Sequence, residues 1–137
     1  MSNPISDKLL IGTIGELFVQ LKLLQFHVQA APPLKDSGND LIACRGEVIK
    51  TIQVKTTTKS DGPLPRKPGK RKKYGILALV KLDGHDNEIY LDRSNIYLVS
   101  KSELESVTYS WEGIADYKIN QNRIERLFNK QHETMAE

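Results

Sequence analysis

Polar and apolar residues alternate along the stretch TIQVK at residues 51–55. An alternation with a period of two predicts a β-strand whose two faces differ. Ile52 and Val54 lie on one face of this strand. Gln53 and Lys55 lie on the other face, so the pattern places an amide and an ammonium group side by side.

A second strand is predicted immediately before this one, and the two should form a hairpin. The strands cover about residues 40–44 and 48–57, with a turn at 46–47 whose leading glycine suits a type II′ conformation. Counting outward from such a turn sets Asp40 directly opposite Gln53. Residues in opposite positions share a face of the sheet, with Cβ atoms about 5 Å apart. The hairpin is therefore expected to bring Asp40 next to Gln53, on the face that also carries the lysine.

Both faces of the hairpin carry apolar residues, which indicates that both are covered, as in an α/β sandwich. A helix is predicted over about residues 6–25. Its apolar stripe includes Leu17 and Leu21 and is expected to face the sheet. We expect this helix to cover the hairpin face that carries Ile42 and Ile49.

The rest of the chain predicts further strands and a C-terminal helix. The continuous apolar run YGILALVK at 74–81 is typical of a buried central strand. The other expected elements are short strands at 88–91 and 95–99, a helical turn at 100–104 and a helix over about 122–131. Neither a repeat nor a second domain is visible in the sequence, so we expect a single domain over 1–137.

The composition is that of an ordinary folded domain. The chain has 137 residues, of which 39% are hydrophobic and 27% are charged. No apolar run approaches the roughly 20 residues of a membrane span, and the first residues lack the pattern of a secretory signal. Cys44 is the only cysteine, which fits a reducing compartment. We therefore expect an intracellular, cytoplasmic protein without a membrane partner.

Basic residues are concentrated in one loop, predicted at 59–73, although the net charge of the chain is only +3. The stretch is rich in proline and glycine, so a mobile loop is expected. Such a run of cations often contacts nucleic-acid phosphates, and in other proteins it is only a solvated loop. The candidate DNA-binding residues are Arg66, Lys67, Lys70, Arg71, Lys72 and Lys73.

The pattern places four polar side chains near one edge of the sheet: Glu16, Asp40, Gln53 and Lys55. Carboxylate and amide oxygens are ligands for a hard cation such as Mg²⁺, for which Mn²⁺ can substitute. A bound cation activates water and neutralises charge on a phosphate. A neighbouring lysine orients that water and stabilises developing negative charge. These are the parts that phosphodiester hydrolysis requires.

Each of these residues also has an ordinary structural alternative. Asp40 follows Ser-Gly-Asn and could be a turn residue, and Glu16 could be an exposed helix residue. Gln53 and Lys55 could form the polar face of an edge strand. The residues alone leave these alternatives open.

The chain resembles the PD-(D/E)xK nuclease superfamily in three short motifs. These are Glu16 within GTIGELF, Asp40 within SGNDLIA, and the Gln-Val-Lys triplet at 53–55. The resemblance implies an α/β fold with a restriction-endonuclease-like αβββαβ core over about 6–105 and a mixed central sheet flanked by helices. It also implies that Glu16, Asp40 and Gln53 bind the metal, and that all four polar residues are catalytic. The superfamily usually has Asp or Glu at the position of Gln53, and a neutral oxygen there should bind metal more weakly.

Within that superfamily, the chain is most similar to the small homing endonucleases of group I introns, which share the Gln-x-Lys variant. The resemblance implies a Mg²⁺-dependent, site-specific endonuclease that cuts double-stranded DNA as a homo-oligomer, either a dimer or a tetramer. Archaeal Holliday-junction resolvases have a similar motif order, so a structure-specific nuclease is an alternative. A catalytically silent nucleic-acid-binding relative and a plain protein-interaction domain are two further alternatives.

Overall fold

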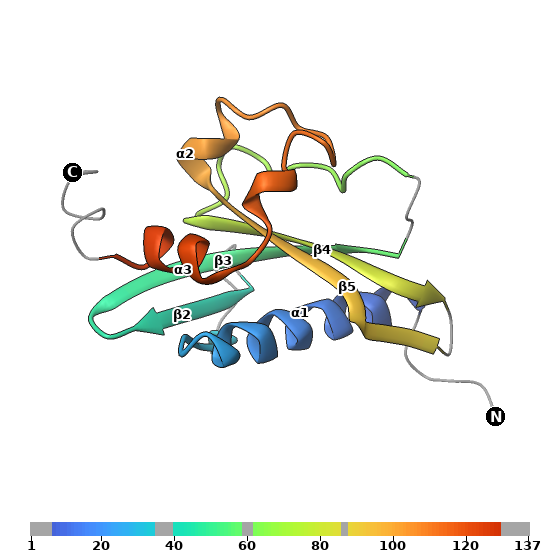
Figure 1. The fold of residues 1–137 in the computed structure, drawn as a ribbon, viewed down its shortest axis with the longest axis horizontal. Coiled ribbons are helices and arrows are strands. Elements are labelled where there is room, and N and C mark those ends of the chain that lie inside the picture. Colours follow the sequence, from blue (N-terminus) through green and yellow to red (C-terminus); the bar gives the residue numbers. More distant parts are fainter. Residues whose placement is uncertain (1–6, 35–39, 59–61, 86–87, 130–137) are drawn as a thin grey trace.

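The computed structural model describes residues 7–34, 40–58, 62–85 and 88–129, in which five strands form one sheet in the order β1-β2-β3-β4-β5. The strands are β1 (Gln29–Ala31), β2 (Leu41–Arg45), β3 (Val48–Thr57), β4 (Ile76–His85) and β5 (Glu88–Ser100). β3 and β4 run parallel, and all other neighbouring strands are antiparallel. The mixed α/β sheet expected from the sequence is therefore confirmed (Figure 1).

The β2–β3 hairpin has the predicted turn and register. Arg45 pairs with Val48, and the ladder continues as far as the pair formed by Leu41 and Ile52. Gly46 has a φ of 62°, whereas the next residue keeps a negative φ, as a type II′ turn requires. Turn chemistry and alternation agree here, which is why the sequence specifies this hairpin so well.

Helix α1 (Asp7–Gln25) covers one face of the sheet, but not the face that the sequence predicts. The residues that pack with α1 lie on the opposite side of the hairpin and include Leu41, Ala43, Ile52 and Val54. Ile42 and Ile49 are 40% and 59% exposed, so the expectation that they pack under this helix is wrong.

The apolar stripe predicted for α1 is also only partly correct. Phe18, Val19 and Leu23 are buried against the sheet, whereas Leu17 and Leu21 are 59% and 49% exposed. The helix is apolar around much of its circumference, so its pattern alone does not specify which side faces the sheet.

The other face of the sheet is covered by the crossover between β3 and β4 together with the segment that follows β5. Buried residues of these segments pack on the sheet as a second core cluster, formed by Leu64, Tyr74, Leu77, Leu79, Val99, Leu104 and Ile114. The αβββαβ order expects a helix in the crossover, but the described residues 62–75 contain none. Three prolines in this short segment remove backbone donors and disfavour a helix there.

The C-terminal part forms one long strand and short helices. The two short strands expected at 88–91 and 95–99 are one continuous strand, β5. It leads into α2 (Lys101–Leu104), the short 3₁₀ helix η1 (Ala115–Tyr117) and α3 (Gln121–Leu127). The predicted C-terminal helix is confirmed, although the end expected at 131 lies outside the described residues. Within the described chain, no helix is long and apolar enough to cross a membrane.

Candidate active site

Asp40 and Gln53 are held together where strand β2 begins. Gln53 Nε2 donates a 2.9 Å hydrogen bond to Asp40 Oδ2, and the backbone N–H of Val54 donates a 2.7 Å bond to the same oxygen. The Asp40 carboxylate thus extends the hydrogen bonding between β2 and β3 beyond Leu41 and Ile52, the last pair of the ladder. Asp40 lies at a bend directly before β2, so the structural role considered for it is real and accompanies any catalytic role.

Gln53 and Lys55 lie on the same face of β3, as the alternation predicts. The register with β4 places Gln53 beside Leu77 and Lys55 beside Leu79, which belong to the second core cluster. Gln53 is only 7% exposed, and Lys55 is half-buried. β3 lies between β2 and β4 in the sheet, but its ladder with β2 ends at Ile52, so the described strand beside Gln53 and Lys55 is β4.

Glu16 approaches the site from helix α1, on the other side of the sheet from Gln53. The helix comes close to β3 at Gly15, where an added Cβ would lie 1.8 Å from Thr56 Oγ1. This close approach brings the half-buried Glu16 to the end of β3. Glu16 and Lys55 line one cavity of about 540 Å³ between the first half of the helix and the strand.

The structure therefore joins the four residues in two pairs. Asp40 and Gln53 are hydrogen-bonded, and Glu16 and Lys55 share a cavity whose described lining does not include the other pair. Lys55 is the link between the pairs, because it follows Gln53 on the same face of β3. The sequence predicts that all four residues lie together near one edge of the sheet. The described contacts instead bring them together as these two pairs.

The donor set fits a hydrated divalent cation that takes few protein ligands. Both hydrogen bonds to Asp40 use Oδ2, so Oδ1 and the Gln53 amide oxygen are the oxygens left to bind a cation. The described residues contain no cluster of three or more His, Cys, Asp or Glu side chains. Mg²⁺ commonly keeps several waters and binds through one or two carboxylates. Asp40 with the Gln53 amide matches that pattern, and Glu16 supplies a further carboxylate in the cavity that also contains Lys55.

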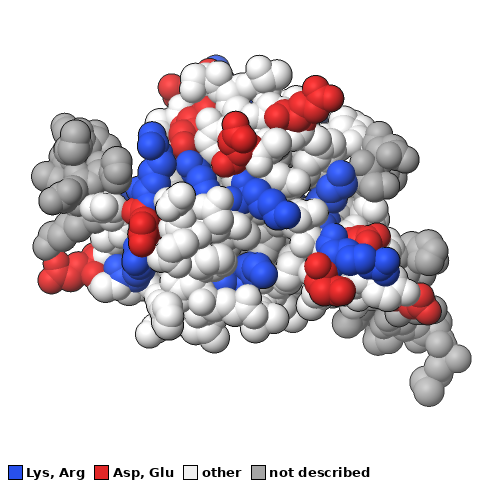
Figure 2. Space-filling model, in the orientation of Figure 1, with Lys and Arg blue, Asp and Glu red and all other residues white. Residues whose placement is uncertain are grey.

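The basic segment 66–73 lies toward the opposite end of β3 from Lys55. Gly75, which follows it, donates a 2.9 Å hydrogen bond to the carbonyl of Thr51. All six predicted DNA-binding cations of this segment are exposed. On the face of the molecule in Figure 2, Lys and Arg side chains lie in several separate groups.

Hydrogen bonds from the segment that follows β5 hold the loop over its described part, residues 62–73. Trp111 Nε1 donates a 2.8 Å hydrogen bond to the carbonyl of Gly62, and Lys101 Nζ donates one of 2.8 Å to the carbonyl of Lys72. Tyr109 donates its hydroxyl to the carbonyl of Pro65. Burial, with the nearby Tyr74, raises the pKa of Tyr109 to about 12, so this donor keeps its proton. Residues 62–73 form the expected loop without a helix or strand; its mobility stays a prediction, and 59–61 lie outside the described residues.

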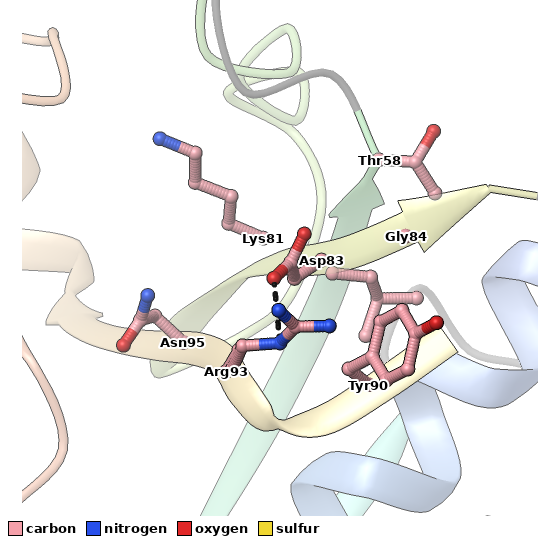
Figure 3. A pocket seen from close by; sticks show the side chains of 8 residues that line it. Thr58, Lys81, Asp83, Gly84, Tyr90, Arg93 and Asn95 are labelled. Atoms are coloured by element: carbon pink, nitrogen blue, oxygen red, sulfur yellow. Dashed lines mark ion pairs between the residues drawn. The ribbon is translucent and has the colours of Figure 1, made fainter. Parts of the chain in front are cut away.

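Sequence patterns offer no reason to select Lys81, yet it lies on the same face as Lys55. It lines a second cavity of about 550 Å³ together with Thr58, Arg93 and Asn95 (Figure 3). Its position within a continuous apolar run hides which face it occupies, because such a run has no alternation. Only the register with β3 reveals it.

The fold is also found among solved structures. A bacterial homing endonuclease, I-Ssp6803I, has the same fold, with a TM-score of 0.63, 16% sequence identity, and coverage of 94% of this chain and 98% of that chain. Neither a scan against protein-family models nor a search of curated proteins found a match. At this identity the comparison establishes the shared fold alone.

Proposed function

We propose that this protein is a metal-dependent endonuclease that hydrolyses phosphodiester bonds in double-stranded DNA. The observation that carries the proposal is the Asp40–Gln53 hydrogen bond, with Lys55 on the same strand face. The likeness in fold to a homing endonuclease supports it and favours cleavage at a specific site.

In this proposal, Asp40 and Gln53 would hold Mg²⁺ through their remaining oxygens, and Glu16 would contribute directly or through a water. When bound, such an ion would supply Lewis acidity toward the phosphate and would lower the pKa of water. The Lys55 ammonium holds the attacking water and neutralises charge as it develops on the phosphate. The half-buried position of Lys55 reduces competition from solvent and strengthens this electrostatic effect.

The exposed cations of the 66–73 segment hold the DNA backbone in this proposal. The segment lies on the same side of the sheet as Lys55, toward the other end of β3. In this proposal a duplex bound at the active site also passes near these cations. One site of this kind cuts one strand. Cutting both strands of a duplex therefore requires two copies of the chain, so we propose that the protein acts as a homo-oligomer.

The test is cleavage of a randomised DNA library with Mg²⁺ and then with Mn²⁺, followed by sequencing of the new ends. The proposal predicts cation-dependent ends at an enriched sequence that disappear with Asp40→Asn. Asparagine keeps an oxygen that can accept the Val54 N–H, so this variant tests the charge of Asp40 with less damage to the fold. Cleavage that persists in EDTA, or that Asp40→Asn leaves unchanged, would refute the proposal.

A further inference from the structure

One row of the sheet carries three polar side chains next to the candidate active site. The register places Thr57 beside Lys81, and Lys81 beside Asn95. These residues follow Lys55 and Leu79 on the same face of the sheet. Two residues along a strand span about 7 Å and neighbouring strands lie about 5 Å apart, so the backbones of Lys81 and Lys55 are about 8–9 Å apart.

The cavity around Lys81 adjoins the candidate active site at Thr58. Thr58 lines both the cavity that contains Lys55 and the cavity that contains Lys81. In Figure 3, Lys81 and Asn95 extend to the same side of the sheet. Thr58 is therefore the point at which the two cavities lie next to each other.

Lys81 is held in place by an aromatic platform. Its Nζ lies 4.7 Å from the centroid of the Trp111 ring. The Trp111 indole is itself fixed by its hydrogen bond to Gly62 and by a tilted contact with Tyr97, whose ring centroid lies 5.7 Å away. A lysine positioned in this way loses less side-chain freedom when it binds an anion.

Lys81 also carries a positive charge that no described carboxylate of this cavity neutralises. Asp83 is the carboxylate among the described lining residues, and it forms a 3.2 Å ion pair with Arg93 (Figure 3). Arg93 also stacks on Tyr90, 4.0 Å from the ring centroid. Within the described chain, Lys81 forms no ion pair, so its positive charge faces the cavity uncompensated.

We propose that Lys81, with Asn95 beside it, forms a phosphate-binding position for the DNA strand that is cut. This inference rests on the proposed endonuclease function. Phosphates follow one another along a strand with a rise of about 3.4 Å. The separation of Lys81 from Lys55 therefore corresponds to a phosphate within about three nucleotides of the reacting bond. Trp111 is a positioning residue in this proposal, because its ring holds the Lys81 ammonium group.

The test is binding of a mixed-sequence DNA duplex in EDTA, measured by fluorescence anisotropy over a series of salt concentrations. Lys81→Gln should weaken binding at low salt by up to about tenfold and reduce the slope of log K against log salt by about 0.9. Lys81→Arg should restore the slope, because it keeps the charge. Lys22→Gln is the matched control: it removes one lysine from α1, on the other face of the sheet, and should leave the slope unchanged.

The outcomes separate this inference from the proposed function. If wild-type protein binds DNA and Lys81→Gln keeps its slope, the phosphate position at Lys81 is wrong and the endonuclease proposal stands. If Lys22→Gln lowers the slope as much as Lys81→Gln does, net charge alone explains the effect and the inference is again wrong. If wild-type protein does not bind DNA at low salt, both proposals fail.

Discussion

Gln53 donates a 2.9 Å hydrogen bond through Nε2 to Oδ2 of Asp40, so a neutral amide occupies the place beside the carboxylate. A second carboxylate at this position would repel Asp40 in the absence of a cation. The neutral amide therefore stabilises the metal-free protein, and it would bind a metal ion less strongly than a carboxylate.

This relationship predicts that Gln53→Glu makes stability depend on metal. Without a divalent cation the variant should be about 1–3 kcal/mol less stable than the wild type, because a buried hydrogen bond becomes a repulsion. Mg²⁺ or Ca²⁺ should restore much of that stability, and thermal unfolding in EDTA and in each cation measures it. Gln53→Met, which has a similar shape but no oxygen, should not be rescued. Equal rescue of both variants would show that the cation binds elsewhere.

The fold was predictable wherever local patterns agree with one another. Alternation and the Gly46 turn together determine the register of the hairpin, and hence the proximity of Asp40 to Gln53. The face covered by α1 was not predictable, since the helix carries leucines on its exposed side as well, among them Leu17 and Leu24.

Contacts between residues that lie far apart along the chain could not be predicted from the sequence either. Lys81 reaches the face that carries Gln53 and Lys55 only through the parallel pairing of β3 with β4. The 62–73 segment is anchored by Trp111, which lies far along the chain. A proline-rich, basic stretch viewed alone gives no sign of that anchor.

The contact between α1 and β3 predicts opposite effects for the two glycines of the helix. Gly15→Ala would bring a Cβ to 1.8 Å from Thr56 Oγ1, so it should cost about 1–3 kcal/mol and displace Glu16. Gly12 has no atom within 4 Å of an added Cβ, so Gly12→Ala should gain up to about 1 kcal/mol from helix propensity. Chemical unfolding of both variants measures the difference. A Gly15→Ala variant as stable as Gly12→Ala would contradict the close packing.

The ion pair between Glu103 and Arg123 predicts a loss of stability in acid. Arg123 is 8% exposed and donates to both carboxylate oxygens of Glu103 and to the carbonyl of Leu98. Burial alone would raise the pKa of Glu103, but hydrogen bonds from Arg123 and the Ser100 backbone, with the Arg123 charge, hold it below its ordinary value.

A carboxyl group whose pKa falls on folding stabilises the protein above its unfolded pKa, and this contribution disappears as the pH falls through the folded pKa. Glu103→Gln should therefore be less stable than the wild type near neutral pH, by about 1–2 kcal/mol, because the guanidinium of Arg123 loses its charged partner. The difference should shrink below about pH 4.5, the ordinary pKa of the group. Unfolding free energies measured over this range test the sign, and a difference that grows in acid would contradict it.

The exposed cations of the basic segment predict a graded effect on DNA binding. Replacing Lys70, Arg71 and Lys73 with glutamine should reduce the salt slope of binding by about 0.9 for each phosphate that the protein no longer neutralises. Stability should change little, because these side chains are exposed. A titration of one duplex at several salt concentrations measures the slope. A slope equal to that of the wild type would remove the segment from the DNA interface.

The most direct test of the proposed mechanism is the single-turnover rate of DNA cleavage in Mg²⁺ for wild type, Lys55→Gln and Lys50→Gln. Lys55 and Lys50 lie on the same strand, but the register places them on opposite faces of the sheet. The mechanism predicts that Lys55→Gln lowers the rate by about 100-fold or more while DNA binding in Ca²⁺ persists, and that Lys50→Gln cuts at close to the wild-type rate. Full activity in Lys55→Gln, or an equal loss in Lys50→Gln, would contradict the assignment of this face of β3 as the active site.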